Sequence, residues 1–408
     1  MFDVRKIRND FPMIVNNPKM IYFDNAATSF KPQVVIDKVN EYYTRFNTNI
    51  HRGDYDISFK ISNEYESVRN TIKDFINANS PKEIVFTSGD TASINTIAYG
   101  YALNKLKKGD VILTTQAEHA SDILPWFSVC EKTGAQIKYI ELNDDGTFNM
   151  ENYLNCFNDN NIKMVAITYV SNVLGYEYPI KEITKIAHKN NAIVTVDAAQ
   201  AVAHLKIDVK ELDVDFLSFS SHKMCGPAGV GVIYGKIHLL NEMTPLFLGG
   251  GSNARFDNKG QLLLKEAPYK FEAGTANIEG VLGLNEAVKY LNSLTMDEIH
   301  SYIKKLTEYL ISKLSKLDNV IIYNLKTDTG IVSFNVKDIF AQDVGSYLNS
   351  QGICVRSGNH CAKILHNVIG VNESIRVSLY FYNTKEEIDK LVDVIKDITL
   401  EKCIGAVI

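Results

Sequence analysis

The sequence places a lysine at the end of an apolar, strand-like stretch, "DFLSFSSHKMCGPAGVGVIYG", over residues 215–235. Lys223 directly follows His222, and the small residues at 226–229 come after it. Lysine is rarely buried without a partner. The amine therefore either lies on an exposed turn or loses its charge by a reaction such as condensation with an aldehyde.

Further polar side chains follow other strand-like stretches. Asp197 and Gln200 lie in "TVDAAQA", His119 in "AEHAS" and Asn172 in "YVSNVLG". The segment "FTSGDTASIN" reads as strand, turn and helix, where backbone N–H groups and the helix dipole favour a phosphate. Each piece alone has a plain structural interpretation, such as an aspartate that caps a helix. Together they offer a lysine, a carboxylate, an imidazole and a phosphate cradle, which are the partners that pyridoxal phosphate needs.

Alternating strands and helices must position these side chains. Short β-branched runs occur at 83–88, 110–115, 136–142, 163–170, 192–199, 215–220 and 230–235. Helical patterns separate several of them, at 91–106, 121–134 and 179–191. This alternation predicts an α/β fold with a mostly parallel sheet, whose ligands bind at the carboxyl ends of the strands.

The pattern changes after about residue 280. Long helical segments are followed by the strand-like runs "NVIIYN", "GIVSFNV" and "SIRVSLY", with helices around 342–350 and 385–398. We expect two domains: a large cofactor-binding domain over 20–285, and a smaller α+β domain formed by 1–19 and 286–408.

Composition excludes several classes of protein. The net charge of −5 argues against non-specific binding to nucleic acid. No apolar run reaches the roughly 20 residues that span a bilayer, and the first residues, "MFDVRKIRNDFPMI", do not resemble a secretory signal. The six cysteines are scattered without a CxxC pair, which favours free thiols in a reducing cytoplasm and no metal site.

The motifs in their order resemble the SufS-type (group II) cysteine desulfurases of the class V aminotransferase-like pyridoxal-phosphate family, which have fold-type I. The resemblance covers nearly the whole chain. It is carried by "IYFDNAATSFKP", "NIHRGDYDIS", "FTSGDTASIN", "AEHASDILPW", "VSNVLG", "VDAAQAVAH", "SSHKMCGPAGVGVIYG", "FEAGTANIEG", "VRSGNHCA" and "RVSLYFYNT".

The resemblance implies a role for each site residue. Lys223 would hold pyridoxal 5'-phosphate as a Schiff base, and the substrate carboxylate would be held by arginine, whose planar fork suits a carboxylate. The cofactor residues would be Asp197 at the ring nitrogen, Gln200 at the ring oxygen, His119 over the ring face, and Thr91, Ser220 and His222 at the phosphate, with Thr275 from a second subunit. The substrate residues would be Asn172, Arg376 and Arg356.

Cys361, in "RSGNHCA", falls where the family has its sulfur-accepting cysteine. The implied reaction converts L-cysteine to L-alanine: Lys223 and His119 assist, and a Cys361 thiolate takes the sulfur as a persulfide. Only the thiolate is nucleophilic, so its surroundings matter. We expect His360 and Arg356 to favour the anion.

The resemblance also implies a homodimer, a sulfur-acceptor protein of the SufE or SufU kind, and a supply of sulfur for iron–sulfur cluster assembly. Fold does not fix reaction, however. A selenocysteine lyase, an epimerase or an aminotransferase on the same fold is the first alternative. A non-catalytic sulfur-carrier scaffold is the second.

Several positions depart from the family pattern. Asp90 brings a carboxylate towards the phosphate site, and Gln342 stands where one branch of the family has a histidine for a zinc-containing acceptor. Asn359 replaces a histidine. The aromatic residues at 380–382 are expected to narrow the substrate entrance. Cys225, beside the lysine loop, is interpreted as a small packed residue, with a second reactive thiol as the alternative.

Overall fold

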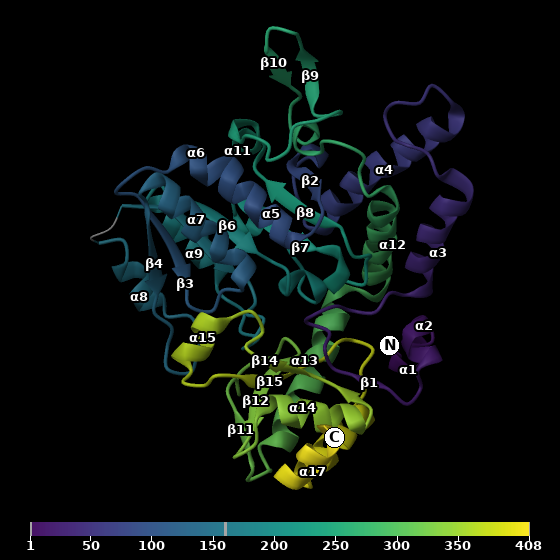
Figure 1. The fold of residues 1–408 in the computed structure, drawn as a ribbon, viewed down its shortest axis with the longest axis vertical. Helices are drawn as coiled ribbons and strands as arrows, with labels where there is room; N and C mark the ends of the chain where they lie inside the picture. Colours follow the sequence, from purple (N-terminus) through teal and green to yellow (C-terminus); the bar gives the residue numbers. More distant parts are fainter. Residues whose placement is uncertain (1, 159–160, 408) are drawn as a thin grey trace.

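A seven-stranded sheet forms the centre of the protein in the computed structural model, which describes residues 2–158 and 161–407 (Figure 1). The strand order is β2-β8-β7-β6-β5-β3-β4. The strands are β2 (Ile84–Thr87), β3 (Val111–Thr115), β4 (Gln136–Ile140), β5 (Ile162–Thr168), β6 (Ile193–Asp197), β7 (Phe216–Ser220) and β8 (Gly231–Gly235). The mostly parallel α/β sheet expected from the sequence is thereby confirmed.

Strand β8 is the antiparallel exception, because it pairs antiparallel with both β7 and β2. It starts at Gly231, soon after β7 ends at Ser220. A parallel return needs a crossover of about a dozen residues or more. The short connection, which carries the lysine turn, therefore brings the chain straight back beside β7.

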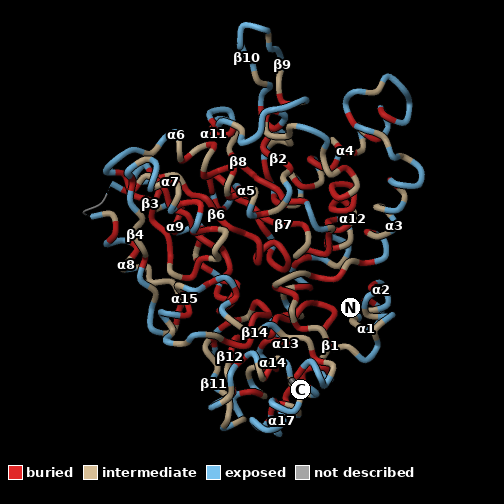
Figure 2. Tube along the Cα trace, viewed as in Figure 1, coloured by how far each residue is buried: buried red, intermediate tan, exposed pale blue. Residues whose placement is uncertain are grey.

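Each strand supplies side chains to two separate cores, one on each face of the sheet. Val165 and Ile167 pack into the larger core, whereas Met164 and Ala166 pack into the other. This alternation follows from the two-residue period of a strand. Figure 2 shows the resulting buried centre, with exposed chain at the periphery. The sheet is therefore held rigid from both sides.

Helices cover both faces of this sheet. The larger core receives α4 (Asp56–Phe75), α9 (Ile180–Lys189) and α12 (Ile278–Leu294), and α12 also packs on α3 (Gln33–Glu41). The other core receives α5 (Asp90–Ile97), α7 (Leu124–Thr133) and α11 (Ile237–Glu242). Shorter helical segments are α1 (Val4–Arg8), α2 (Pro12–Asn16), α6 (Leu103–Lys105), α8 (Met150–Asn155), α10 (Val209–Leu212), α15 (Lys363–Val368), the 3₁₀ turns η2 (Pro81–Glu83), η4 (Ala120–Asp122), η5 (Ala201–Ala203), η6 (Ser221–Lys223) and η7 (Tyr269–Phe271), and the π turns η1 (Tyr42–Phe46) and η3 (Ala98–Ala102).

A second, antiparallel sheet lies below the first in Figure 1, with its own core. Its order is β11-β12-β15-β14. The strands are β11 (Val320–Ile322), β12 (Ile331–Val336), β14 (Arg356–Gly358) and β15 (Ser374–Ser378), and the helices around them are α13 (Met296–Leu314), α14 (Ala341–Ser350), α16 (Lys385–Lys396) and α17 (Leu400–Val407).

The N-terminal segment ties into this second region. Strand β1 (Ile21–Tyr22) pairs in parallel with β13 (Ile353–Cys354), and Asp24 bridges to Ser378. The domain limits given above stay a prediction. A hairpin of β9 (Asn253–Phe256) and β10 (Leu262–Leu264) projects at the top of Figure 1. Within the described residues, no helix has both the length and the apolar character needed to cross a membrane.

Candidate active site

A cavity of about 550 Å³ opens where the carboxyl ends of the central strands face the second sheet. It brings together every site residue predicted from the sequence except Thr275. The lining includes Thr91, His119, Asn172, Asp197, Gln200, Ser220, His222, Lys223, Arg356, Cys361 and Arg376, together with Asp90, Gln342, Asn359 and His360.

Lys223 ends the 3₁₀ turn η6, directly after the buried strand β7. Burial lowers the pKa of its amine, and the nearby carboxylate of Asp197 acts in the opposite direction. A lowered pKa leaves more of the amine unprotonated and nucleophilic. The turn therefore presents an amine suited to condensation with a carbonyl group.

Asp197 and Gln200 are held in place by backbone groups. Asp197 ends β6 and is buried, and its Oδ1 accepts a hydrogen bond from the Ala199 N–H at 2.8 Å. Gln200 donates from Nε2 to the Ala26 carbonyl at 3.0 Å, which fixes the orientation of the amide. Both side chains thus line the cavity in orientations fixed by hydrogen bonds to the backbone.

His119 stands at the N-terminus of turn η4. Its Nδ1 accepts from the Ser121 N–H at 3.1 Å, so the hydrogen of a neutral ring resides on Nε2. Burial and the neighbouring Lys223 lower the pKa of the imidazole. Thr91 lies close by, with its hydroxyl 2.8 Å from that of Ser121. The ring is therefore neutral and fixed in orientation.

Asp90 opens helix α5 beside the expected phosphate cradle. Its N–H donates to the Ser220 hydroxyl at 2.7 Å, and its Oδ1 is buried without a hydrogen-bond partner in the described part of the chain. Burial and the adjacent Asp197 raise the pKa of the Asp90 carboxyl well above its usual value. The neutral acid is favoured, which reduces the repulsion between Asp90 and a phosphate.

Arg376 and Arg356 lie directly opposite each other on β15 and β14. Like charges in this arrangement repel. Asp24 lies between them, with Oδ1 3.0 Å from Arg376 Nη2 and Oδ2 3.5 Å from Arg356 Nη1. Arg376 also donates to the Asn172 carbonyl at 2.9 Å. Asp24 was not predicted as a site residue, although it opens the "DNAAT" segment that the family resemblance includes.

Cys361 lies on the loop that follows β14 and is exposed. His360 and Cys361 both have left-handed backbone conformations, with φ of 51° and 57°. The Cys361 carbonyl accepts from the Ala120 N–H at 2.8 Å, and the His360 carbonyl accepts from Asn172 at 2.9 Å. These contacts tie a strained loop to the large sheet, with the thiol at the mouth of the cavity.

The expected cationic role of His360 is wrong. The side chain is 8% exposed, and burial together with the Arg376 charge lowers the pKa of its imidazole to about 2. A neutral ring cannot stabilise a thiolate by charge. Of the two residues predicted for that role, Arg356 is the one that remains, and it lines the same cavity as Cys361.

The expected narrowing of the entrance by Tyr380, Phe381 and Tyr382 is also wrong. All three are at most 3% exposed, belong to the larger core and do not line the cavity. Cys225 is likewise fully buried, and burial raises the pKa of its thiol to about 12. This supports its interpretation as a packed residue.

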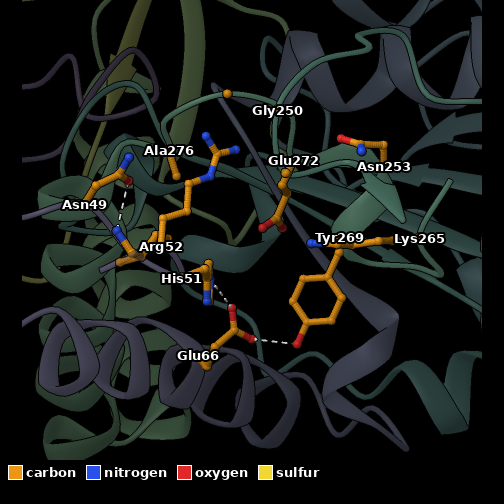
Figure 3. A pocket seen from close by; sticks show the side chains of 13 residues that line it. Asn49, His51, Arg52, Glu66, Gly250, Asn253, Lys265, Tyr269, Glu272 and Ala276 are labelled. Carbon is orange, nitrogen blue, oxygen red and sulfur yellow. Dashed lines mark hydrogen bonds and ion pairs between the residues drawn. The ribbon is translucent and has the colours of Figure 1, made fainter. Parts of the chain in front are cut away.

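Thr275 lies away from this cavity and is exposed. Its neighbours Gly274 and Ala276 line a second cavity of about 780 Å³ (Figure 3). There, Glu66 contacts His51 and Tyr269, each at 3.2 Å. Thr275 therefore does not meet Lys223 within one chain.

The cavity fits pyridoxal phosphate. A buried carboxylate, a neutral imidazole, hydroxyl groups and an amine of lowered pKa surround it. Polar atoms of four lining residues lack a partner in the described chain: Asp90 Oδ1, Asn172 Oδ1, His360 Nδ1 and Arg376 Nε. Such buried atoms need a ligand. Across the described residues, no group of three or more His, Cys, Asp or Glu side chains is arranged to bind a metal.

Comparison with known proteins defines the class of this fold and site. Residues 21–391 match the family Aminotransferase class-V, and the chain belongs to that family. Within it, the chain is 42% identical over 392 residues to a probable cysteine desulfurase of Halalkalibacterium halodurans, covering 95% of this chain and 96% of the relative. The class V family expected from the sequence motifs is thus confirmed.

Solved structures of cysteine desulfurases have the same fold as this chain. An apo cysteine desulfurase from Thermococcus onnurineus NA1 superposes with a TM-score of 0.92 at 37% identity, covering 96% of this chain and 97% of that one. The cysteine desulfurase CsdA of Escherichia coli, solved as the S-sulfonic acid, gives a TM-score of 0.91 at 31% identity and 99% coverage of both chains.

Proposed function

We propose that the protein is a pyridoxal-phosphate-dependent, SufS-like cysteine desulfurase that converts L-cysteine to L-alanine and leaves a persulfide on Cys361. The observation that carries this proposal is the meeting of the half-buried Lys223 amine and the exposed Cys361 thiol on one cavity. The similarity to proteins named cysteine desulfurases supports it.

The residues would hold the cofactor in the following way. Lys223 would bind its aldehyde, and the other contacts would be Asp197 at the ring nitrogen, Gln200 at the ring oxygen, His119 over the ring face, and Thr91, Ser220 and His222 at the phosphate. When bound, the cofactor supplies an electron sink for negative charge at the substrate α-carbon. Burial and Lys223 lower the pKa of His222 to about 4, so that side chain would act as a neutral donor.

The substrate would be bound through its carboxylate. Arg376 still has an unpartnered Nε–H that can donate to a carboxylate, whereas the unpartnered Oδ1 of Asn172 can only accept, from a donor such as an amine. A guanidinium binds a carboxylate through two parallel hydrogen bonds, which also fixes its direction. Arg356, at the cavity rim, would add charge. This would direct the substrate side chain towards the loop that carries Cys361.

The sulfur transfer balances with the groups present. The Lys223 amine would take the α-proton. The Cys361 thiolate would attack the substrate sulfur, so that an S–S bond forms as the substrate Cβ–S bond breaks. The electron pair of the broken bond stays on Cβ, which takes up a proton, and alanine leaves. Cys361 keeps the sulfur as a persulfide.

Assembly and sulfur delivery are also part of the proposal. A homodimer would bring Thr275 of the partner subunit to this cavity, and the exposed apolar side chains of Phe256 and Leu263 on the hairpin support a further protein contact. The exposed Cys361 would pass sulfur to an acceptor of the SufE or SufU kind for iron–sulfur cluster assembly in the cytoplasm. Gln342, on the cavity wall, would face that acceptor.

The test is incubation of the holoenzyme with L-cysteine. Alanine should appear, and the peptide that carries Cys361 should gain the mass of one sulfur atom. The Cys361→Ala variant should bind the cofactor but release no sulfur. If that variant turns over normally, another class V reaction, such as selenocysteine lyase, replaces the proposal. A wild-type chain that does not take up pyridoxal phosphate would instead be a non-catalytic scaffold.

A further inference from the structure

Two acidic side chains lie against each other on the wall of the active-site cavity. Asp90, the first residue of helix α5, and Asp197, the last residue of strand β6, both line this cavity, and both are buried. The two side chains are in hydrogen-bond contact with each other. The backbone of Asp90 is held in place, because its N–H donates to the Ser220 hydroxyl at 2.7 Å. The fold therefore fixes this pair of acids at the end of the central sheet.

The contact requires a hydrogen on one of the two groups. Two carboxylates offer only acceptors, so they cannot form a hydrogen bond with each other. Their negative charges would also repel at such close range. As an anion, Asp90 would in addition have a buried oxygen, Oδ1, that no donor in the described chain reaches. One proton on the pair removes the repulsion and turns one of the two groups into a donor.

The surroundings of the two groups place that proton on Asp90. Asp197 Oδ1 accepts a hydrogen bond from the Ala199 N–H at 2.8 Å, and a bond of this kind favours the ionised form. Asp90 has no such donor at its Oδ1, and burial together with Asp197 raises the pKa of its carboxyl. Ser218 and Lys223 also face Asp90 and favour its anion, but burial and Asp197 outweigh them. Asp90 is therefore the acid of the pair, and Asp197 is the anion.

A donor at Asp90 acts on the residue proposed to meet the ring nitrogen of the cofactor. That role requires Asp197 to be ionised and to keep one orientation. The Ala199 N–H holds one oxygen of its carboxylate, and the hydrogen of Asp90 provides a second hydrogen bond. Hydrogen bonds to an ionised group are stronger than those between neutral groups. The pair therefore supports both the charge and the orientation of Asp197.

Resting on the proposed function, we propose that Asp90 is a positioning residue that remains a neutral acid, donates its hydrogen to Asp197, and thereby keeps Asp197 as the anion for the cofactor ring. Asp90 acts through Asp197 and needs no contact with the ring itself. The aspartate that departs from the family pattern thus supports cofactor binding instead of opposing it.

The first experiment detects the neutral acid directly, without turnover. Infrared spectra of the full chain in heavy water at neutral pH are recorded for the wild type and Asp90→Asn, each with and without pyridoxal phosphate. The difference between the two chains should contain the C=O band of a protonated carboxyl group in the wild type. Glu118 and Asp122, whose buried carboxyls also have a raised pKa, occur in both chains and should cancel. A difference that contains only carboxylate bands overturns the proposal.

The second experiment tests the hydrogen bond through the affinity for the cofactor. The cofactor-free full chain is titrated with pyridoxal phosphate, and the absorbance of the bound cofactor gives Kd. Asp90→Asn keeps a donor for Asp197 and should keep the wild-type Kd. Asp90→Leu is equally neutral and of similar shape but has no donor, so its Kd should rise about tenfold, the effect of one lost hydrogen bond to a charged group. Equal Kd values for the two variants overturn the role of the hydrogen bond.

The possible failures are distinguishable. If Asp90→Leu does not fold, Asp90→Ala makes the same comparison with Asp90→Asn. A wild-type chain that takes up no pyridoxal phosphate overturns the proposed function, whereas the infrared band of the cofactor-free chain still tests the pair of acids. A chain that binds the cofactor but releases no alanine from L-cysteine also overturns the proposed function, and the Kd values then still decide the role of Asp90.

Discussion

Removal of the Asp24 carboxylate tests how the cross-strand arginines are tolerated. In Asp24→Asn, the charges of Arg376 and Arg356 stay opposite each other with no anion between them. Loss of one partner of a buried ion pair costs about 3–5 kcal/mol. The Asp24 side chain is 20% exposed and Arg376 only 3%, so partial solvent screening reduces the expected loss to about 2–3 kcal/mol of unfolding free energy.

The assay is urea unfolding of wild type and variant, followed by circular dichroism at one protein concentration. Because both chains expose the same surface when they unfold, the slope should be shared and the midpoint alone should fall. Glu211→Gln is the matched control. It breaks an ion pair of similar length, 3.0 Å between Lys181 and Glu211, in which both side chains are more than half exposed, and it should leave the midpoint unchanged.

Asp24→Asn should also change the kinetics with L-cysteine. With a neutral amide in place of the carboxylate, one of the two hydrogen bonds that orient the Arg376 guanidinium loses its charge assistance, so KM for L-cysteine should rise more than kcat falls. If Asp24→Asn and Glu211→Gln shift the urea midpoint equally, Asp24 is not the counter-ion that keeps the two arginines together, and the electrostatic account of this sheet is refuted.

Two further substitutions and one labelling experiment have outcomes that the structure predicts. Asp90→Asn should raise the free energy of unfolding at pH 7, and this gain should vanish towards pH 3. The reason is that the raised pKa of the buried Asp90 carboxyl destabilises the fold only at pH values where Asp90 is ionised in the unfolded chain. Urea midpoints measured across this pH range that show no such gain would contradict the prediction. Iodoacetamide should label the exposed Cys361 within minutes and spare Cys225, whose buried thiol has its pKa raised to about 12; peptide masses that show equal labelling contradict the packing. Tyr382→Phe removes a buried hydroxyl that donates to Asn25, and it should lower the free energy of unfolding by about 1–3 kcal/mol while KM stays unchanged. A changed KM would indicate that these aromatic residues do shape the substrate entrance.

The sequence predicted the strands of the central sheet because their apolar runs are continuous and separated by clear helical patterns. It did not predict the direction of β8. The short link after β7 was visible, but pairing direction depends on which neighbour the strand meets. The β9–β10 hairpin was missed because most of its residues are exposed and lack a buried face, although Asp257 and Gly260 between its strands are turn residues.

The candidate site was predictable where polar residues end buried strands, as Asp197 and Lys223 do. Contacts between segments that are distant in the sequence could not be predicted. Asp24 meets Arg376 across 352 positions of sequence, and no local spacing reveals that pair. The neutrality of His360 likewise depends on burial and on Arg376, neither of which its own motif shows. The residue types of the site could thus be predicted from the sequence, whereas the charge state of a residue such as His360 could be inferred only from the packed structure.

The bridge from Asp24 to β15 also has a consequence for biosynthesis. A ribosome completes the central sheet, with Lys223 and Asp197, long before it makes Arg376. A nascent chain at that stage has the residues that would capture the vitamin-derived group, but it lacks the arginine that would grip an amino acid. Binding of an amino-acid carboxylate by Arg376 therefore has to wait until the last strand of the second sheet has emerged and joined a segment translated at the outset.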